Sequence, residues 1–573
     1  MRNVQLVFAC IAVLAGRAAA QAPPTINLRL PSSAAGGGTL AVRLTIPPQV
    51  VGPRYAEGAP IVVFVAGGHG TGTLNGGQSF ALQGFVAVNF LFPGGVEGSF
   101  HSDGTFDYRG AQCIAALGDV ILFAGGRKTD DLGRGIGQLL PFRALTEMVG
   151  LHGSSNGGPM SMAVLGTYGG ELGFVTTYVG WENPTNSQTV VVEAGGKGYD
   201  CSPTVDGDGN GIPTDDGKNP YLASYGAASL GMEFGRLAYD STVVWTATDP
   251  ANLHPPVAHT GVLFLDGNGN GRLDTLLGDP DCYDANDNGR LDAGDDYLFR
   301  PLAAYDTGNL LLHYSIEVAN EAQARQVFGA TWPADVASPA ENAGYWALRD
   351  ATSFYAAVAA ARPDLHCLLS FAAEDHVQAS DDHLHIQQAY DGLRGGGIWC
   401  RLNPDEAYYR LVNSTPARPP ADNDANVAVA WPAMGACAEE YPLSSTQGTL
   451  AAVMEMADRA RGRNWLANLE GPVSDVESGR LAGSHGVRIT PNPATAAAAI
   501  EWWGIEAGSA TLRLYDVAGR RRAALPIVTS GREGRLGLER LLGAGSGLSP
   551  GVYWLEFRAA GGRPIRRSLV IRR

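Results

Sequence analysis

One serine in this chain stands in a setting that is typical of an activated nucleophile. Residues 148–158 read Met-Val-Gly-Leu-His-Gly-Ser-Ser-Asn-Gly-Gly, which places Ser155 at the centre of a Gly-x-Ser-x-Gly motif. An apolar run precedes the motif, and a helix-compatible segment starts at Pro159. In a strand–turn–helix arrangement the flanking glycines permit a tight turn that projects the hydroxyl above the edge of the sheet. The motif therefore predicts nucleophilic, acyl-transfer chemistry at Ser155.

Apolar segments around this motif are typical of strands buried in a parallel sheet. Residues 60–70 and 84–95 are continuous runs of β-branched and aromatic residues that end in glycines. Residues 365–377 read Leu-His-Cys-Leu-Leu-Ser-Phe-Ala-Ala-Glu-Asp-His-Val, a further predicted strand with Asp375 at its carboxyl end. Because predicted strands alternate with helical segments, we expect an α/β fold with a doubly wound, mostly parallel sheet and ligands at the carboxyl ends of its strands.

Residues 55–185 and 340–410 resemble the α/β-hydrolase superfamily. The resemblance rests on the Gly-Gly-His-Gly turn, the motif around Ser155 and the Ala-Glu-Asp-His-Val segment. It implies that Ser155 is the nucleophile and that Asp375 orients the general base. It also implies an oxyanion hole formed by the N–H of Asn156 and one from the Gly68–His69 turn. The alternative is a Rossmann-like sheet with a glycine-rich turn and no chemistry.

The general base is the part of this pattern that the sequence does not locate. The family carries a histidine after its last strand, here Ile-Trp-Cys-Arg-Leu at 398–402, but Asn-Pro-Asp-Glu-Ala-Tyr-Tyr follows. The candidates nearest to Asp375 are His376, His383 and His385, of which the last two open a predicted helix over 381–393. A histidine there could reach the sheet edge or serve as a surface or cap residue. A serine without a base should be nearly inert.

An insertion over residues 186–340 carries acidic loops with calcium-binding spacing. Residues 284–295 place oxygen-bearing side chains at loop positions 1, 3, 5, 9 and 12 and glycine at position 6. Aspartate at position 12 resembles dockerin loops more than sensor EF-hands. Residues 266–274 repeat positions 1 to 9, with Leu277 where the last ligand belongs, and residues 206–213 are a third partial copy. The predicted Ca2+ ligands are Asp206, Asp208, Asn210, Asp266, Asn268, Asn270, Asp274, Asp284, Asn286, Asn288, Asp292 and Asp295.

The calcium is expected to be structural. It would replace a hydrophobic core in a loop-rich lid that shapes the substrate site, since insertions at this point commonly act as lids in α/β hydrolases. The alternatives are asparagine- and glycine-rich turns without metal, a true dockerin that binds a scaffold protein, and a calcium-triggered switch.

The amino terminus resembles a secretory signal peptide. A charged start is followed by apolar residues 4–16 and by Ala-Ala-Ala at 18–20, which predicts cleavage before Gln21. No later segment is long and apolar enough to span a membrane. Export leaves six cysteines, which permit three disulfides in an oxidising compartment. Cys201–Cys282 is the preferred pair, and Cys367 and Cys400 are alternatively buried thiols in neighbouring strands; the other two cysteines are Cys113 and Cys437.

From residue 487 the pattern changes to short period-two strands, which predicts a small β-sandwich. Pro-Asn-Pro at 491–493, Tyr-Asp-Val-Ala-Gly-Arg at 515–520 and Leu-Ser-Pro-Gly-Val-Tyr at 548–553 resemble the sorting domain of type IX secretion and the related FlgD-like immunoglobulin fold. The resemblance implies passage across the outer membrane, or attachment at the cell surface, with the secretion machinery as a partner. The alternative is a generic β-sandwich that binds something else.

The net charge of −16 disfavours nucleic acid as a partner. Two classes of function remain. The first is a secreted serine hydrolase, esterase or peptidase-like, that acts on a small-molecule ester or a peptide. The second is a catalytically inactive, calcium-stabilised surface protein of the same fold, and a histidine beside Ser155 separates the two. The expected organisation is a signal peptide (1–20), a core in two parts (21–185 and 341–470), the insertion (186–340), a linker (471–486) and the β-sandwich (487–573).

Overall fold

The computed structural model divides into two compact units, residues 1–461 and residues 462–573. Several predicted features lie outside the residues that it describes: the signal peptide, the loops 206–213 and 284–295, Asp375, His376, His383, Cys201, Cys282 and Cys437. The described residues are 22–190, 234–274, 296–299, 301–306, 309–371, 377, 384–405, 408, 412, 445–462, 486–490, 499–503, 508–516, 521–529, 533–542, 551–559 and 565–571.

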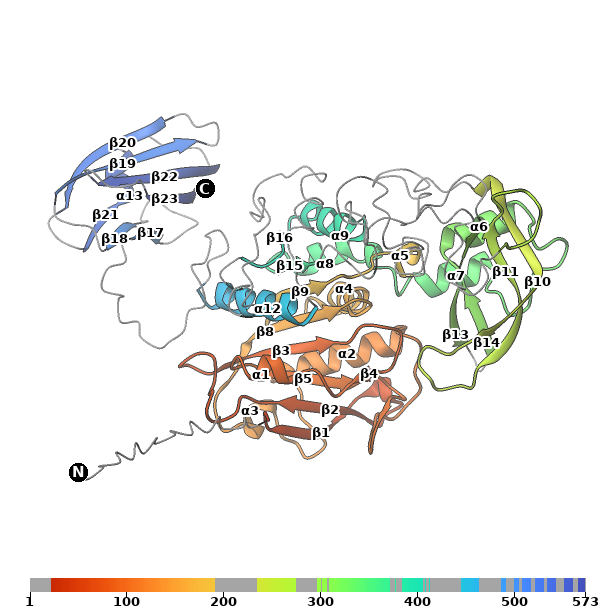
Figure 1. Cartoon of the computed structure of the whole chain (residues 1–573). Helices are drawn as coiled ribbons and strands as arrows, with labels where there is room; N and C mark the ends of the chain where they lie inside the picture. The colour runs from red at the N-terminus through yellow and green to blue at the C-terminus, as the bar shows by residue number, and fades with distance from the viewer. Residues whose placement is uncertain are drawn as a thin grey trace, which may run out of the picture. The chain divides into compact units, whose positions relative to one another are not determined.

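The first unit is built on a mixed, mostly parallel sheet, which confirms the expected α/β class (Figure 1). β1 and β2 pair antiparallel, as do β2 and β5, while every later pair along the main order is parallel. In spatial order the strands are β1 (Thr25–Pro31), β2 (Thr39–Thr45), β5 (Val86–Leu91), β3 (Ala59–Val65), β8 (Ala144–Ser154), β9 (Val175–Trp181), β15 (His366–Ser370) and β16 (Trp399–Leu402), and β4 (Gly72–Thr73) pairs with β5 at its side.

The central strands are buried on both faces, as their continuous apolar sequences predict. Helices α2 (Ala111–Ala124), α4 (Gly157–Tyr168), α8 (Tyr355–Ala361) and α9 (Leu384–Gly395) pack in a row, each against the next in space. Ile61, Val63 and Val65 of β3 belong to the large core cluster that these helices complete. The short helices α1 (Gln78–Ala81) and α3 (Ile136–Leu139) complete the first half of this unit.

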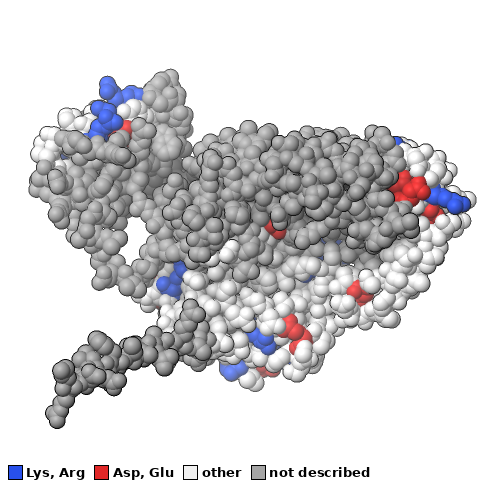
Figure 2. Space-filling view, in the orientation of Figure 1, with Lys and Arg blue, Asp and Glu red and all other residues white. Residues whose placement is uncertain are grey.

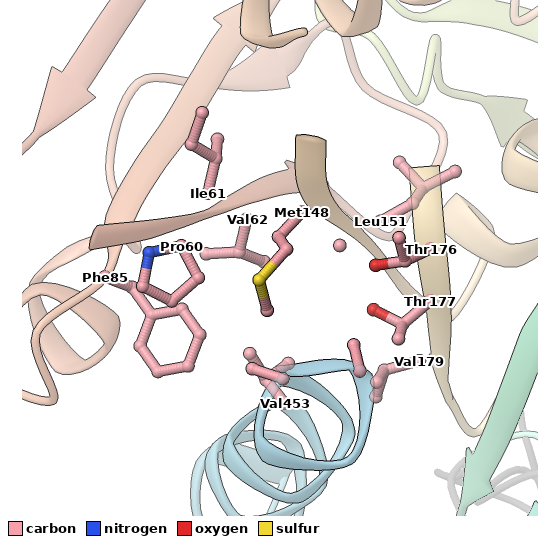
Figure 3. A pocket seen from close by; sticks show the side chains of 13 residues that line it. Pro60, Ile61, Val62, Phe85, Met148, Leu151, Thr176, Thr177, Val179 and Val453 are labelled. Carbon is pink, nitrogen blue, oxygen red and sulfur yellow. The ribbon is translucent and has the colours of Figure 1, made fainter. Parts of the chain in front are cut away.

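Helix α12 (Ser445–Gly462) also packs against the sheet, and it does so beside Val62 of β3, which alternates along the strand with Ile61, Val63 and Val65. A cavity of about 320 Å³ lies between them, and Figure 3 shows Val62 of β3, Met148 of β8 and Val453 of α12 around it. The lining is apolar apart from two threonines and carries no titratable group. This cavity is therefore a packing gap of the core rather than a site for chemistry.

The segment before β15 forms two helices rather than one continuous helix. α7 (Pro339–Trp346) begins at a capping box in which Ser338 and Glu341 bond each other's backbone. A short turn η6 (Ala351–Ser353) follows, and the carboxylate of Asp350 accepts the N–H of Thr352 there, before α8 begins. The local cap competes with helix continuation, which a periodic apolar pattern does not register.

The insertion is not the loop-rich lid without a core that the sequence suggested. Buried apolar side chains, including Leu263, Tyr314 and Val318, form a hydrophobic cluster of its own. The carboxyl half of β11 is a continuous buried run that contributes to this core, and the acidic segments before β10 and after β11 obscured it in the sequence. Its elements are β10 (Leu237–Ala247), β11 (Val257–Leu265), β12 (Tyr297–Leu298), β13 (Leu302–Asp306), β14 (Asn309–His313), α5 (Ser187–Val190), α6 (Ile316–Ala324) and η5 (Phe234–Arg236).

The second unit contains two antiparallel sheets whose apolar side chains join one hydrophobic cluster. The four segments that the sequence predicts as strands after residue 487 lie in β17, β19, β22 and β23. One sheet is β17 (Gly486–Thr490), β18 (Ala499–Trp503) and β21 (Glu533–Gly537), and the other is β20 (Arg521–Thr529), β19 (Gly508–Asp516), β22 (Gly551–Ala559) and β23 (Ile565–Ile571), with the helix α13 (Leu538–Leu542) between strands.

Cys113, Cys367 and Cys400 are buried free thiols, so the three disulfides that six cysteines permit are not all formed. Cys367 and Cys400 face each other in register on β15 and β16, which confirms the alternative of buried thiols in neighbouring strands. Burial raises the pKa of the Cys400 thiol to about 12, so the thiolate is scarce and the group is unreactive.

Charged side chains of both signs lie interspersed on the described surface, and the face in Figure 2 carries no broad basic patch. Among the helices that the structure describes, none is both long and apolar enough to cross a membrane.

A buried carboxylate fastens α12 to the rest of the first unit. Asp458 accepts two bonds from the guanidinium of Arg54, at 2.9 and 2.7 Å, and one from each of the hydroxyls of Tyr55 and Tyr408, at 2.6 and 2.7 Å. The Asp458 side chain is fully buried, and that of Arg54 is 8% exposed. The paired charges are thus largely removed from water, where loss of one partner is far more costly than at a surface.

We expect Asp458→Ala to lower the free energy of unfolding by about 3–5 kcal/mol, because Arg54 then stays buried without its carboxylate. Urea unfolding of the purified chain measures this change. The matched control is Glu57→Ala, which removes the half-exposed partner of Arg461 on the same helix and should cost about 0–1 kcal/mol. Equal losses in the two variants would contradict the role given to Asp458.

Candidate active site

Ser155 occupies a strained turn between β8 and α4. Its φ of +47° lies in the left-handed region, which side chains other than glycine adopt at a cost of about 1–2 kcal/mol. The turn is held by two bonds of 2.8 Å, from the Ser155 N–H to the Trp181 carbonyl and from the Gly158 N–H to the Ser155 carbonyl. The serine is half-buried, beside the carboxyl end of the sheet. The predicted strand–turn–helix geometry is therefore present at Ser155.

The glycines of the motif are required by close backbone contacts. A Cβ on Gly153 would lie 2.8 Å from the Gly157 carbonyl oxygen, and one on Gly157 would overlap the carbonyl of Val65 at the end of β3. A Cβ on Gly67, in the turn after β3, would lie 2.9 Å from Cβ of Ser155. The turn after β3 thus packs directly against the serine, which only residues without side chains allow.

Asn183 also stabilises this turn, a role that the sequence did not indicate. Its Nδ2 donates to the carbonyls of Gly153, Ser155 and Trp181, at 2.9, 2.8 and 3.0 Å. Its Oδ1 accepts the hydroxyl of Tyr178 at 2.7 Å. One buried amide therefore fixes the orientation of three peptides around the serine. Its signal in the sequence is slight, a single asparagine shortly after a strand end.

The residues predicted for the oxyanion hole lie together beside Ser155. Nδ2 of Asn156 is 3.1 Å from Nε2 of His69. Among the described residues, the backbone N–H groups of Gly68 and Asn156 have no acceptor. Partial burial, and then the positive charges of Arg109 and Arg349, lower the pKa of His69 to about 3, so its ring is neutral at physiological pH.

Arg109 was also missed by the sequence analysis, and it lies directly behind this turn. Its NH2 donates to the carbonyls of Ala66 and Gly67, at 2.9 and 3.0 Å, and its NH1 donates to that of Asn156 at 3.2 Å. The residue is 4% exposed, and its guanidinium lies 5.2 Å from the ring centre of Phe92. Burial lowers the pKa of Arg109 to about 10, which still leaves it charged at neutral pH.

A pocket of about 300 Å³ adjoins the predicted oxyanion residues. Aromatic, apolar and basic side chains form its walls, and part of the wall comes from the insertion and from α7. This composition suits a small organic substrate. The lining residues are His69, Tyr108, Arg109, Asn156, Pro159, Met160, Val190, Leu302, Tyr345, Trp346 and Arg349.

Of the predicted triad partners, the structure describes His385 and neither Asp375 nor His383. His385 is fully buried in the first turn of α9, rather than a surface or cap residue. On the same face, one turn later, Gln388 accepts a bond from Nδ2 of Asn186 at 3.1 Å, in the segment that follows β9. The start of α9 therefore lies at the same edge of the sheet as the Trp181 carbonyl that binds Ser155.

A second histidine near the pocket is held by a carboxylate. Nδ1 of His254 lies 2.9 Å from Oδ2 of the buried Asp249, and its ring stacks on Tyr305 with centres 3.8 Å apart. The hydroxyl of Tyr108, which lines the pocket, is 3.3 Å from the same nitrogen. No recognisable motif marks this pair in the sequence, since its members lie in a loop of the insertion.

The one predicted calcium loop that the structure describes, residues 266–274, curls around Asp266. The Asp266 carboxylate accepts the N–H groups of Gly269 and Gly271, each at 2.7 Å. The buried Asp296 accepts the N–H of Asp274 at 2.6 Å, and burial, together with the nearby carboxylates, raises its pKa. Within the described part of the chain, no three His, Cys, Asp or Glu side chains are arranged to hold a metal ion.

Comparisons with known proteins give structural likenesses at low sequence identity. No protein-family model and no curated protein matches the chain. A hypothetical protein from Pseudomonas aeruginosa is 19% identical, over 36% of this chain and 55% of that one, with a TM-score of 0.22. An esterase from Rhizomucor miehei is 13% identical, over 67% and 74%, with a TM-score of 0.30. Carboxyl esterase 2 from Tuber melanosporum is 11% identical, over 67% and 76%, with a TM-score of 0.28. The chain thus spans about half the length of the first of these structures.

The strain at Ser155 can be measured without reference to activity. We expect Ser155→Gly to be more stable than Ser155→Ala by about 1 kcal/mol, because glycine adopts the left-handed turn without a Cβ penalty. Chemical unfolding of both variants tests this. At the neighbouring Ser154, in extended strand, the same two substitutions should rank in the opposite order, since glycine there weakens the strand. An alanine variant at 155 as stable as the glycine variant would show that the turn is unstrained.

Proposed function

We propose that this protein is a secreted serine hydrolase that acts on small esters or on peptides by acyl transfer through Ser155. The observation that carries the proposal is the strained, half-buried serine beside two N–H groups, those of Gly68 and Asn156, for which no described residue is an acceptor. Donors fixed in advance at such a position stabilise negative charge that develops on a carbonyl oxygen. The adjoining pocket is lined by aromatic, apolar and basic side chains, among them His69 and Asn156.

In the proposed reaction the Ser155 hydroxyl attacks the carbonyl carbon of the substrate and passes its proton to an imidazole. The carbonyl oxygen becomes an oxyanion that accepts the N–H groups of Gly68 and Asn156. The intermediate then collapses, and the imidazolium gives its proton to the leaving alcohol or amine. Water, deprotonated by the same imidazole, attacks the acyl-enzyme and releases the acid with the free serine.

We assign the base to His385, with His383 and Asp375 kept as the other proposed members of the catalytic set. The burial of His385 supports this choice, and so does the bond between Asn186 and Gln388, which brings the first turn of α9 to the edge of the sheet where Ser155 stands. The alternative function is an inactive binding protein of the same fold.

The acidic loops of the insertion are proposed to bind structural Ca2+. In residues 266–274 the Asp266 carboxylate caps the N–H groups of the following glycines, which is compatible with the sharp turn of a calcium loop. The buried Asp296 adds a carboxylate close to Asp274. Oxygen-rich donor sets of this kind suit Ca2+ better than softer metals. The sorting role of the second unit, and export by a signal peptide, complete the proposal.

Reaction with a fluorophosphonate tests the hydrolase directly. The wild-type chain should become covalently labelled, and Ser155→Ala should not, because the probe requires an activated serine. His385→Ala should slow labelling by about 10²–10⁴-fold, the usual contribution of a general base. Intact-protein mass spectrometry follows both.

His254→Ala is the matched control, since His254 also lies near the pocket and is held by Asp249. It should label at close to the wild-type rate. Labelling that persists in Ser155→Ala, or an unreactive wild-type chain, would rule out the hydrolase and favour the binding protein. If His254→Ala slows labelling and His385→Ala does not, the general base is His254 of the insertion rather than His385.

Chelation tests the metal. We expect EGTA to lower the melting temperature of the full chain and added Ca2+ to restore it, because an ion that binds the folded state stabilises it by mass action. Asp266→Asn should weaken the response to EGTA, whereas Asp364→Asn, at an exposed carboxylate outside the insertion that pairs with Arg362, should leave that response unchanged. Mg2+ in place of Ca2+ should restore less. A melting temperature that EGTA does not move would defeat the proposal.

A further inference from the structure

Arg109 is a buried charge without a carboxylate partner. None of the described acidic side chains forms an ion pair with it, and its hydrogen bonds all go to backbone carbonyls. Its Nε, also buried, has no acceptor within the described part of the chain. Burying a cation without an opposite charge is costly, so such a group is expected where it meets negative charge at another stage.

The carbonyls that Arg109 holds belong to the peptides around the predicted oxyanion hole. In a trans peptide the C=O and N–H point in opposite directions. Since the Gly67 carbonyl points at the guanidinium, 3.0 Å away, the N–H of Gly68 points away from it. The Asn156 carbonyl also points at the guanidinium, at 3.2 Å, while Asn183 holds the preceding carbonyl of Ser155 at 2.8 Å.

The backbone of Arg109 itself is shaped for this position. Tyr108 and Arg109 have φ values of +52° and +68°, two successive residues in the left-handed region. Neither is a glycine, so the local conformation is strained and must be stabilised by what surrounds it. The bonds from Arg349 to the carbonyls of Tyr108 and Asp107, at 2.6 and 2.7 Å, hold this segment in place.

We propose that Arg109 is the positioning residue of the oxyanion hole, which joins the turn after β3 to the serine turn and complements the negative charge of the transition state. This inference rests on the proposed hydrolase function. The guanidinium acts through two segments 42 and 47 residues away in sequence. It orients and polarises the Gly67–Gly68 peptide, whose N–H belongs to the predicted hole, and it binds the Asn156 carbonyl of the serine turn. No described side chain offers Arg109 an opposite charge, and in the transition state the oxyanion on the far side of the Gly67–Gly68 peptide supplies it.

Steady-state hydrolysis of p-nitrophenyl acetate by the full chain tests this role. Arg109→Met should lower kcat by about 10²–10³-fold, as loss of an oxyanion donor does, with KM changed less than about threefold, because the ground-state ester binds the hole weakly. Arg109→Lys keeps the positive charge but not the planar guanidinium, so its kcat should lie between those of the wild type and Arg109→Met. Guanidinium ion should restore part of the rate of Arg109→Ala.

The matched control is Arg362→Met. Arg362 is likewise a buried arginine that donates to backbone carbonyls, those of Leu172 and Val175, at the amino end of β9. This variant should lose stability with kcat per folded molecule unchanged, and guanidinium should not change the kcat of Arg362→Ala. Melting curves show whether each variant folds. If Arg109→Met does not fold, the same test, a loss of kcat with little change in KM, is applied to Arg109→Lys.

The outcomes separate the inference from the function on which it rests. A wild-type chain that neither reacts with fluorophosphonate nor hydrolyses the ester overturns both. A reactive wild type whose Arg109→Met and Arg109→Lys variants keep its kcat overturns the inference and leaves the hydrolase standing. A loss confined to KM, or equal losses in the Arg109 and Arg362 variants, also overturns it, since either result denotes a general effect on structure.

Discussion

The close approach of two turns, those that follow β3 and β8, is the constraint on which the candidate site depends. A Cβ on Gly157 would overlap the Val65 carbonyl, and a Cβ on Gly67 would lie 2.9 Å from Cβ of Ser155. Because the two strands are parallel neighbours, their carboxyl ends meet at one edge of the sheet. This contact places a serine hydroxyl and unsatisfied backbone N–H groups together, and every catalytic proposal made for the protein follows from that placement.

The sequence predicted those parts of the fold whose signals are local. The serine turn was found because its glycines flank Ser155 directly, and β3 and β5 because burial on both faces demands unbroken apolar runs. Asn183 and Arg109 were missed because they bind backbone carbonyls, which leave no trace in residue type. The core of the insertion was missed because conspicuous acidic segments lie before β10 and after β11. The base stays a prediction, since the residues between β15 and α9 that would decide it lie outside the described part of the chain.

Polar side chains that hold backbone groups recur throughout the first unit. Asn183, Arg109 and Arg349 each bind two or more main-chain carbonyls from separate segments. Such residues fix loops that contain many glycines and would otherwise have considerable conformational freedom. The backbone at the site is therefore ordered by a few buried hydrogen-bond donors rather than by bulky side chains.

The position of α12 affects the order in which the chain folds. This helix covers one face of β3 and supplies the buried partner of Arg54, yet it lies some four hundred residues later in the sequence. While the chain is synthesised, the sheet can assemble with that face still open to water. The first unit closes only when residue 461 has emerged, so a nascent chain remains partly unfolded until late in its synthesis.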